Sequence, residues 1–368
     1  NLATDDKLNK IRPIFSHLVT KFMSAYRPGE NITVDESLML WKGRLGWKQF
    51  IRTKRARFGI KSFDLCESRT GYLYNSSIYT GKGTDNTGDS DLGLSGSIVM
   101  HLTDPLLDQG RTVFLDNWYS SPKLFIALNN RGTNAVGTVR TNRVGLPKKI
   151  TANPLRKGEM EVQQLPPLTY VTWNDRRQVS MLSNCHSRVE MVNTGKSDPV
   201  TKQTIFKPDI IQLYNQNMGG VDLVDQVTQA YPSMRKTIKW YKKLFLHMID
   251  IVIYNSLVIW KALHTGQQMT ILDFRLAISR CLVEQHHVPR PLHTGGKKST
   301  QPSPLRLKER HFLTKIPATE KKKYASRRCV LCKKNGIRKE VRTMCVACGD
   351  VPLCFNPCFE IYHTRLNL

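Results

Sequence analysis

The feature that most constrains how this chain can fold is a group of cysteine and histidine residues near its C-terminal end. Six of the nine cysteines fall within residues 329–358, and two pairs have the spacing Cys-x2-Cys. Cysteines grouped this closely indicate metal binding in a reducing compartment rather than a disulfide framework. The spacing suits tetrahedral Zn²⁺, so we expect one or two zinc ions here. The seven candidate ligands are Cys329, Cys332, Cys345, Cys348, Cys354, Cys358 and His363.

Positive charge is the second strong signal. The chain contains 56 Lys and Arg against 29 Asp and Glu, a formal net charge of +27. Such an excess indicates a polyanionic partner, and nucleic acid is favoured over a membrane surface because aromatic residues are sparse. No run of about 20 apolar residues is present, so we expect no membrane span and no membrane partner. Residues 297–342 hold 16 Lys and Arg against three acids, which favours contact with the DNA backbone or a nuclear import signal around Lys321-Lys322-Lys323. We therefore expect a nuclear protein.

Apolar patterning before this tail predicts a mixed α/β fold. Alternating and β-branched runs predict strands, and apolar residues three and four apart predict helices. The first strands should form an antiparallel set, and a hairpin is expected to turn at Asn174-Asp175. A long helical run follows Gly219-Gly220, a pair that permits a turn closed to other residues. The predicted strands lie at 31–37, late in 49–67, and at 71–80, 111–119 and 135–140, and the first helices lie within 1–30, 94–107 and 122–130.

Three of the predicted elements carry an acidic residue that could contribute to one common site. Asp35 lies on the first strand, Asp116 ends the fourth, and Asp222 opens a late helix, with Asp225 three residues further along the same helix face. If the first and fourth strands are neighbours, their two acids meet at one edge, and a helix packed on the sheet can bring the third. Each acid also has a simpler role open to it, as a cap, a turn residue or a first-turn acid favoured by the helix dipole.

Three converging carboxylates suit one kind of chemistry in particular. Phosphoryl transfer by two Mg²⁺ ions, about 4 Å apart, requires hard oxygen ligands and a carboxylate that bridges both ions. In a chain with a net charge of +27 the substrate of such a site would be nucleic acid. We therefore predict an Mg²⁺ or Mn²⁺ site formed by Asp35, Asp116 and Asp222.

Four blocks of this sequence resemble the signature blocks of piggyBac-type DNA transposases, in the family's order. The blocks are Ile32-Thr33-Val34-Asp35-Glu36, Lys54-Arg55-Ala56-Arg57-Phe58-Gly59-Ile60-Lys61, Leu115-Asp116-Asn117-Trp118-Tyr119-Ser120-Ser121, and Tyr214-Asn215-Gln216 through Asp225-Gln226. The resemblance implies a ribonuclease H-like core with Asp35, Asp116 and Asp222 as the catalytic metal-binding triad and Asp225 as an adjacent acid. It also implies nicking of double-stranded DNA at transposon ends, hairpin formation and insertion at TTAA targets. We expect the active form to be a homodimer.

The resemblance also implies a ribonuclease H-like core in two parts, with a β-rich insertion domain between them and a Cys-rich zinc-binding domain at the end. The Pro-rich and Gly-rich stretch at 289–304 predicts a basic linker before the zinc-binding domain. The expected ranges are 1–138 and 206–265 for the core, 139–205 for the insertion, 266–322 for the linker and 323–368 for the zinc-binding domain.

A cross-brace finger of the RING or PHD type is the zinc fold that the resemblance implies. In that scheme the first and third ligand pairs hold one ion, which here means Cys329, Cys332, Cys354 and Cys358. The remaining three ligands, which include His363, lack a fourth. The missing ligand could lie beyond Leu368, or the pairing could differ.

Two functional classes remain open from the sequence. One is an active transposase, and the other is a domesticated, non-catalytic DNA-binding or chromatin-binding protein derived from such an enzyme. Intact acids favour the first class, because carboxylates held together repel one another unless a metal relieves the repulsion. A ubiquitin ligase that uses the tail as a RING is a weaker third reading, since the tail is joined to a core with its own acid triad.

Overall fold

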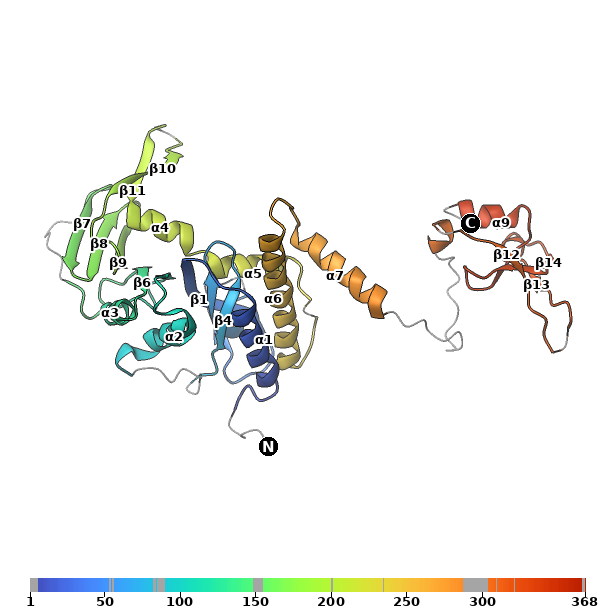
Figure 1. The fold of residues 1–368 in the computed structure, drawn as a ribbon, viewed down its shortest axis with the longest axis horizontal. Coiled ribbons are helices and arrows are strands. Elements are labelled where there is room, and N and C mark those ends of the chain that lie inside the picture. The colour runs from blue at the N-terminus through green and yellow to red at the C-terminus, as the bar shows by residue number, and fades with distance from the viewer. Residues whose placement is uncertain are drawn as a thin grey trace. The chain divides into compact units, whose positions relative to one another are not determined.

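The computed structural model describes most of the chain, in two compact units that comprise Asn1–His287 and Val288–Leu368 (Figure 1). The described residues are 6–52, 54, 56–81, 84, 90–147, 155–199, 201–233, 235–286, 304–308, 310–320, 322–365 and 368. Most of the Pro-rich and Gly-rich stretch at 289–304, on which the linker prediction rested, lies outside the described residues.

A nine-stranded mixed sheet forms the centre of the first unit. Its strand order is β2-β3-β1-β5-β6-β9-β8-β7, and β4 pairs with β3 off this path. Strand β1 is antiparallel to β3 but parallel to β5, and β5 is parallel to β6. This arrangement confirms the predicted ribonuclease H-like mixed sheet. The strands are β1 Asn31–Leu40, β2 Gln49–Phe50, β3 Phe58–Glu67, β4 Leu73–Ile78, β5 Thr112–Leu115, β6 Asn134–Thr138, β7 Met160–Leu165, β8 Leu168–Asn174 and β9 Gln178–Ser183.

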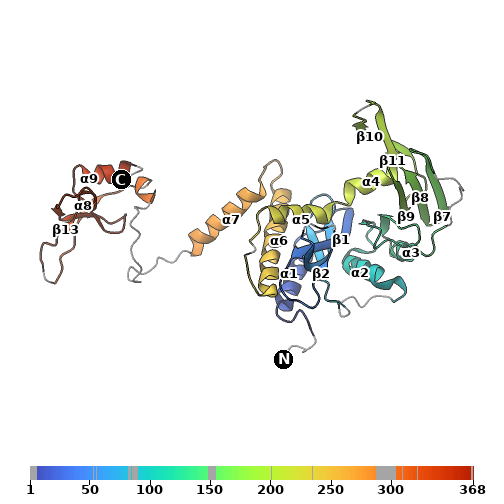
Figure 2. The same ribbon diagram turned by 180° about the vertical axis from the view of Figure 1, so that it is seen from behind.

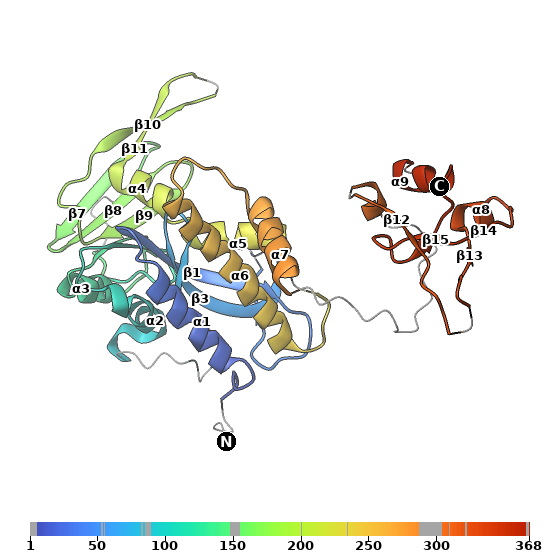
Figure 3. The same cartoon turned by 45° about the vertical axis from the view of Figure 1, so that its right-hand side comes forward.

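Helices cover this sheet. Helix α5 packs on β1 and β3 and against α6, which also packs against α1, while α2 packs on β3 and β4 and α3 packs on β6. Figure 3 shows α1 and α6 side by side, and Figure 2 shows α4 beside β9. The helices are α1 Arg12–Ala25, α2 Gly93–Thr103, α3 Pro122–Asn130, α4 Asp209–Asn217, α5 Gly220–Ala230, α6 Trp240–Leu263 and α7 Ile271–His286, with 3-10 turns at Ser90–Leu92, Asp104–Leu106 and Pro304–Leu307.

Helix α6 accounts for the most apolar stretch of the sequence. Among the described residues it is the one helix long and apolar enough to cross a membrane. Its side chains Leu244, Met248 and Ile251 belong to the main hydrophobic core of the first unit. Helix α6 is therefore a core helix of the first unit.

The segment predicted as an insertion domain, 139–205, largely extends the main sheet. Strands β7, β8 and β9 continue the main sheet, because β9 pairs with β6 through Val136↔Ser183 to Thr138↔Met181. Only the hairpin of β10 (Met191–Ser197) and β11 (Thr204–Pro208) forms a sheet of its own. The predicted hairpin at Asn174 is present as β8 and β9. The segment is β-rich as expected, but most of it belongs to the core sheet.

The expected special turn at Gly219-Gly220 is also corrected. Gly219 has a φ of −79°, and Gly220 is not among the positive-φ glycines. Gly220 is instead required by close packing, since a Cβ atom there would lie 2.9 Å from the carbonyl oxygen of Glu67. The same close approach brings the start of α5 down onto the end of β3.

The second unit is a small domain with cysteines in its core. A three-stranded sheet joins β12 (Leu313–Lys315), β15 (Thr343–Cys345) and β16 (Val351–Pro352), and β13 (Arg327–Arg328) pairs with β14 (Glu340–Val341). Two short helices, α8 (Val330–Lys334) and α9 (Cys358–Thr364), complete it. Because β12 pairs with β15, the domain begins before the predicted boundary at 323. The predicted basic linker at 266–322 likewise contains helix α7 and strand β12.

Candidate functional site

The parallel pairing of β1 with β5 brings two of the predicted acids together. The pairing runs from Asn31↔Thr112 to Val34↔Leu115. Asp35 and Asp116 are the residues that directly follow this paired stretch, one after each of its two segments. Asp116 is held by its own turn, because its Oδ1 accepts the backbone N–H of Trp118 at 2.8 Å. Ligands of open α/β sheets bind where parallel strands end, which is the position of these two acids.

A third acid at this edge is Glu36, which the sequence analysis did not select. Carboxylate oxygens of Asp35, Glu36 and Asp116 all lie within 4.8 Å of one another. Burial, followed by the negative charge of Glu36, raises the pKa of Asp35 to about 8. Burial also raises the pKa of Asp116. Three crowded carboxylates of this kind form a hard-oxygen donor set that fits Mg²⁺ or Mn²⁺.

Lys54 connects this cluster to Asp222. The Nζ of Lys54 donates to the carbonyl oxygen of Glu36 at 2.9 Å and lies 3.4 Å from Oδ1 of Asp222. Burial alone would lower the pKa of Lys54, but the charges of Asp35, Asp222 and Asp225 hold it above its ordinary value. Asp222, on the first turn of α5, has a side chain that is 60% exposed. It therefore faces the cluster across Lys54 and is not one of the three acids in contact.

Asp225 has different surroundings from Asp222. Its Oδ1 accepts a hydrogen bond of 2.6 Å from Ser37 Oγ on β1, and burial raises its pKa. At the junction of α4 and α5, Thr33 Oγ1 donates to the carbonyl oxygen of Asn217 at 2.6 Å. These two bonds fasten the start of α5 to β1, which sets the position of Asp222.

Asp64 is a further buried acid beside the site that sequence reasoning did not select. It lies on β3 directly opposite Asp35 and accepts hydrogen bonds from Ser76 at 2.5 Å and Ser62 at 3.1 Å. Burial raises the pKa of Asp64 to about 7. Its hydroxyl partners satisfy its oxygens within the sheet, and it is not one of the three acids grouped around Asp35.

In the second unit, four cysteines form one candidate metal centre. The Sγ atoms of Cys329 and Cys354 are 3.7 Å apart, and Cys332 Sγ lies 3.8 Å from Cys354 and 3.5 Å from Cys358. A zinc ion about 2.3 Å from each sulfur would place the sulfurs about 3.8 Å apart in a tetrahedron. All four residues are buried. The grouping is the one that the cross-brace scheme implies.

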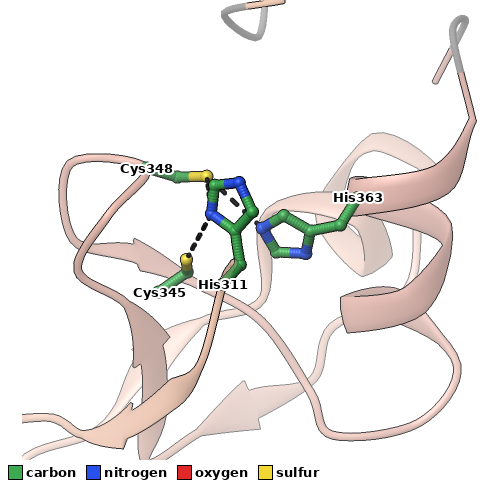
Figure 4. A group of neighbouring side chains, drawn as sticks. All are labelled: His311, Cys345, Cys348 and His363. Atoms are coloured by element: carbon green, nitrogen blue, oxygen red, sulfur yellow. Dashed lines mark hydrogen bonds between the residues drawn. The ribbon is translucent and has the colours of Figure 1, made fainter. Parts of the chain in front are cut away.

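The second candidate metal centre includes His311, which was not among the seven ligands predicted from the sequence. Figure 4 shows His311 beside Cys345, Cys348 and His363, with ligand atoms of all four within 4.8 Å of one another. Sγ of Cys348 lies 3.4 Å from His311 Nδ1 and 3.3 Å from His363 Nε2. The His363 ring is oriented by a 2.7 Å contact between its Nδ1 and the carbonyl oxygen of Phe359, which leaves Nε2 for a metal. His311 thus completes this group of four, so neither of the two alternatives left open from the sequence, a ligand beyond Leu368 or a different pairing, is needed.

The position of His311 explains why the sequence did not reveal it. It lies before the first Cys-x2-Cys pair, inside the stretch predicted as linker, and it has no cysteine or histidine partner at a recognisable spacing. The pairing of β12 with β15 carries it to the metal ligands, because Leu313 lies opposite Cys345. Only a prediction of that strand pair could have identified it.

Comparisons with known proteins agree with this architecture. Residues 1–257 match a family model described as Transposase IS4, and residues 308–364 match one described as a DDE_Tnp_1-like zinc finger. Human PiggyBac transposable element-derived protein 3 is 30% identical over 307 residues, which cover 80% of this chain and 51% of that protein. Human PiggyBac transposable element-derived protein 2 is 26% identical over 300 residues, which cover 77% of this chain and 50% of that protein.

A solved structure is also similar. The piggyBac transposase in a cryo-EM synaptic complex with hairpin DNA aligns with a TM-score of 0.68 and 25% identity over 97% of this chain and 75% of that chain. The chain spans about half the length of the human relatives that it matches. The sheet, the zinc finger and the matched sequence thus agree, and this chain belongs to the piggyBac transposase family of IS4-like DDE transposases.

Proposed function

We propose that this chain contains the catalytic core and zinc finger of a metal-dependent DNA transposase of the piggyBac type. The reaction would be nicking at transposon ends, hairpin formation and strand transfer at TTAA sites. The observation that carries the proposal is the meeting of Asp35 and Asp116 at the end of the β1–β5 pairing, with Asp222 opposite them on α5. The net charge of +27 supports DNA as the substrate.

The residues have distinct roles in this proposal. Asp35, Asp116 and Asp222 would hold Mg²⁺ or Mn²⁺, which would activate the attacking oxygen and stabilise the leaving one. Lys54 places a positive charge beside these acids, where the scissile phosphate has to approach against their repulsion. The bond from Ser37 to Asp225 keeps α5 on the sheet, so that Asp222 stays opposite Asp35.

A cleavage assay tests the proposal. The substrate is a labelled duplex that ends in candidate terminal repeats flanked by TTAA. We expect strand cleavage with Mg²⁺ or Mn²⁺ and almost none with Ca²⁺, because a larger ion with loose coordination should bind without aligning the attacking oxygen. Asp116→Asn should be inactive, while Asp175→Asn, in the turn between β8 and β9, should cleave normally. Cleavage that is as fast in EDTA would refute an enzyme of this kind.

A domesticated, non-catalytic DNA-binding or chromatin-binding protein is the second candidate. It is favoured by one observation, that the matched human proteins are named as transposable element-derived. The same assay separates the two candidates. Binding to the repeats without cleavage under any cation, by full-length protein with intact acids, would support the second.

Further features of the proposal concern metals, assembly and location. We propose one Zn²⁺ in the Cys329, Cys332, Cys354 and Cys358 cluster and one in the cluster that contains His311. We also propose that the protein acts as a homodimer in the nucleus. Light scattering of the protein with and without DNA tests the dimer, and imaging of a fluorescent fusion tests the location.

A further inference from the structure

A cavity of about 760 Å³ opens beside the acid cluster. It lies between the outer half of β1, the start of β3 and the helices α5 and α6. Its walls include the apolar side chains of Leu38 and Leu40 and the hydrogen-bonded pair Ser37 and Asp225. Ser37 is on the same face of β1 as Asp35 and two residues along, a distance of about 7 Å. The cavity is therefore adjacent to the place where the scissile phosphate would lie.

An aromatic pair stands at the rim of this cavity. Phe58, which lines the cavity, is 44% exposed, and its neighbour Phe50 on β2 is 56% exposed. Their ring centroids are 4.7 Å apart. The two residues are directly opposite each other in the β2–β3 pair. Both rings pack against each other and stay partly exposed on this short pair of strands, so their exposed parts are available to a ligand.

Positive charge surrounds the aromatic pair. Lys42, Lys48 and Arg57 line the cavity, against the single acid Asp225, which is already bonded to Ser37. The Nζ of Lys48 lies 5.6 Å from the centroid of the Phe58 ring. Exposed aromatic rings among cations are the arrangement with which proteins bind unpaired nucleotides, because bases stack on the rings while cations meet the phosphates.

We propose that this cavity is a binding site for an unpaired nucleotide of the DNA strand that is being processed, with the base stacked on Phe58. The size of the cavity is in the range of small-molecule sites, whereas paired bases inside a duplex cannot enter it. The inference rests on the proposed function, since hairpin formation leaves unpaired bases close to the scissile phosphate. It adds a base-binding subsite to the acid cluster.

Binding measurements with three DNA molecules test this subsite. All carry the same duplex: one has an unpaired TTAA tail, one has the same tail with abasic sites, and one is blunt. Anisotropy is recorded with zinc-loaded protein in Ca²⁺, so that the DNA stays intact. Wild-type protein should bind the TTAA tail about tenfold more tightly than the abasic tail, because the two tails have the same phosphates and differ only in bases that stack.

Variants show whether Phe58 is the stacking partner. Phe58→Ala should bind the two tails equally, whereas Phe206→Ala, which removes a ring that is 51% exposed on β11, should keep the tenfold difference. Lys48→Gln should weaken binding to both tails alike, because it removes charge and leaves the ring. Thermal unfolding and circular dichroism verify that each variant is folded.

Three outcomes would overturn the subsite. These are equal binding of the two tails by the wild type, a tenfold preference that survives in Phe58→Ala, and loss of the preference in Phe206→Ala. A protein segment as the natural occupant of the cavity would give the first of these outcomes. Failure to bind any of the three DNA molecules would instead contradict the proposed function.

Discussion

Proton release on metal binding gives a direct test of the acid cluster. Burial and the charge of Glu36 raise the pKa of Asp35 to about 8, from an ordinary value of about 3.9. At neutral pH the carboxyl group of the metal-free protein therefore holds a proton, which a metal ion has to displace. Below that pKa, the apparent metal dissociation constant should fall about tenfold for each unit by which the pH rises. This corresponds to a gain of about 1.4 kcal/mol in binding free energy per unit. The raised pKa of Asp116 can only make this dependence steeper.

The same shift fixes the sign of the stability change. Between about pH 4 and 8 the folded protein binds a proton at Asp35 that the unfolded chain does not bind, so the metal-free protein loses stability as the pH rises through this window. The loss has a limit of about 1.4 kcal/mol per pH unit for this one group. Saturating Mn²⁺ should remove it, because the folded protein then holds Asp35 ionised.

Isothermal titration calorimetry of zinc-loaded protein with Mn²⁺ measures this linkage. In buffers with different ionisation enthalpies, the heat reports the number of protons released. The dissociation constant should be about 50-fold lower at about pH 8, where Asp35 is about half ionised, than at about pH 6. Asp35→Asn should bind weakly and with a shallower pH dependence, since its amide does not titrate. Asp175→Asn, whose carboxylate pairs with Lys207 away from the cluster, should behave as the wild type. A wild-type affinity that does not change with pH would refute the reasoning.

Other expected outcomes concern α5 and the zinc finger. Asp222→Asn should abolish strand cleavage and keep DNA binding, whereas Asp225→Asn should impair cleavage less; a Mg²⁺ titration in which Asp225→Asn is dead and Asp222→Asn cleaves normally would reverse this assignment. His311→Ala should reduce the zinc content from two ions per chain to one by elemental analysis, and a wild-type content of one would contradict the two-centre assignment. Gly220→Ala should destabilise the protein by about 1–3 kcal/mol in thermal unfolding, because its Cβ would meet the carbonyl oxygen of Glu67 at 2.9 Å. Gly219→Ala, which meets open space, is the matched control.

The sequence predicted those elements best whose residue types and flanking residues favour the same secondary structure. The strand that carries Asp35 is predictable because Ile32, Thr33 and Val34 are all β-branched, and in the structure all three are fully buried. The helix at 122–130 begins with Pro122 after Ser121, whose side chain accepts the N–H of Leu124 as an N-cap. The continuation of the sheet into β9 was not predictable. It depends on which strand pairs with β6, a choice made by distant residues.

In the candidate site, too, some residues were predictable from local sequence patterns and others were not. Asp35 and Asp116 could be paired from the sequence because Asp35 lies on one apolar strand and Asp116 directly follows another, and the parallel register of β1 and β5 brings them together. Glu36 directly follows Asp35 on β1, and successive residues of a strand point to opposite faces. Its carboxylate nevertheless reaches the same cluster, where the β1–β5 pairing ends. The position of Lys54 beside the acids was also not predictable, because it depends on a hydrogen bond to Glu36, a residue 18 positions away in the sequence.

The pairing of β6 with β9 has a consequence for how this family can change during evolution. Because β9, β8 and β7 are added to β6, the segment between the second and third acids cannot be removed as a cassette. Its loss would remove Ser180 and Asn184, which bond to the backbone N–H of Val139 and the backbone carbonyl of Ala135, and would leave those groups on a new open edge, next to the strand that leads to Asp116. Open edges of this kind invite pairing with other molecules. Length variation is therefore best tolerated in the β10–β11 hairpin, which forms a sheet of its own.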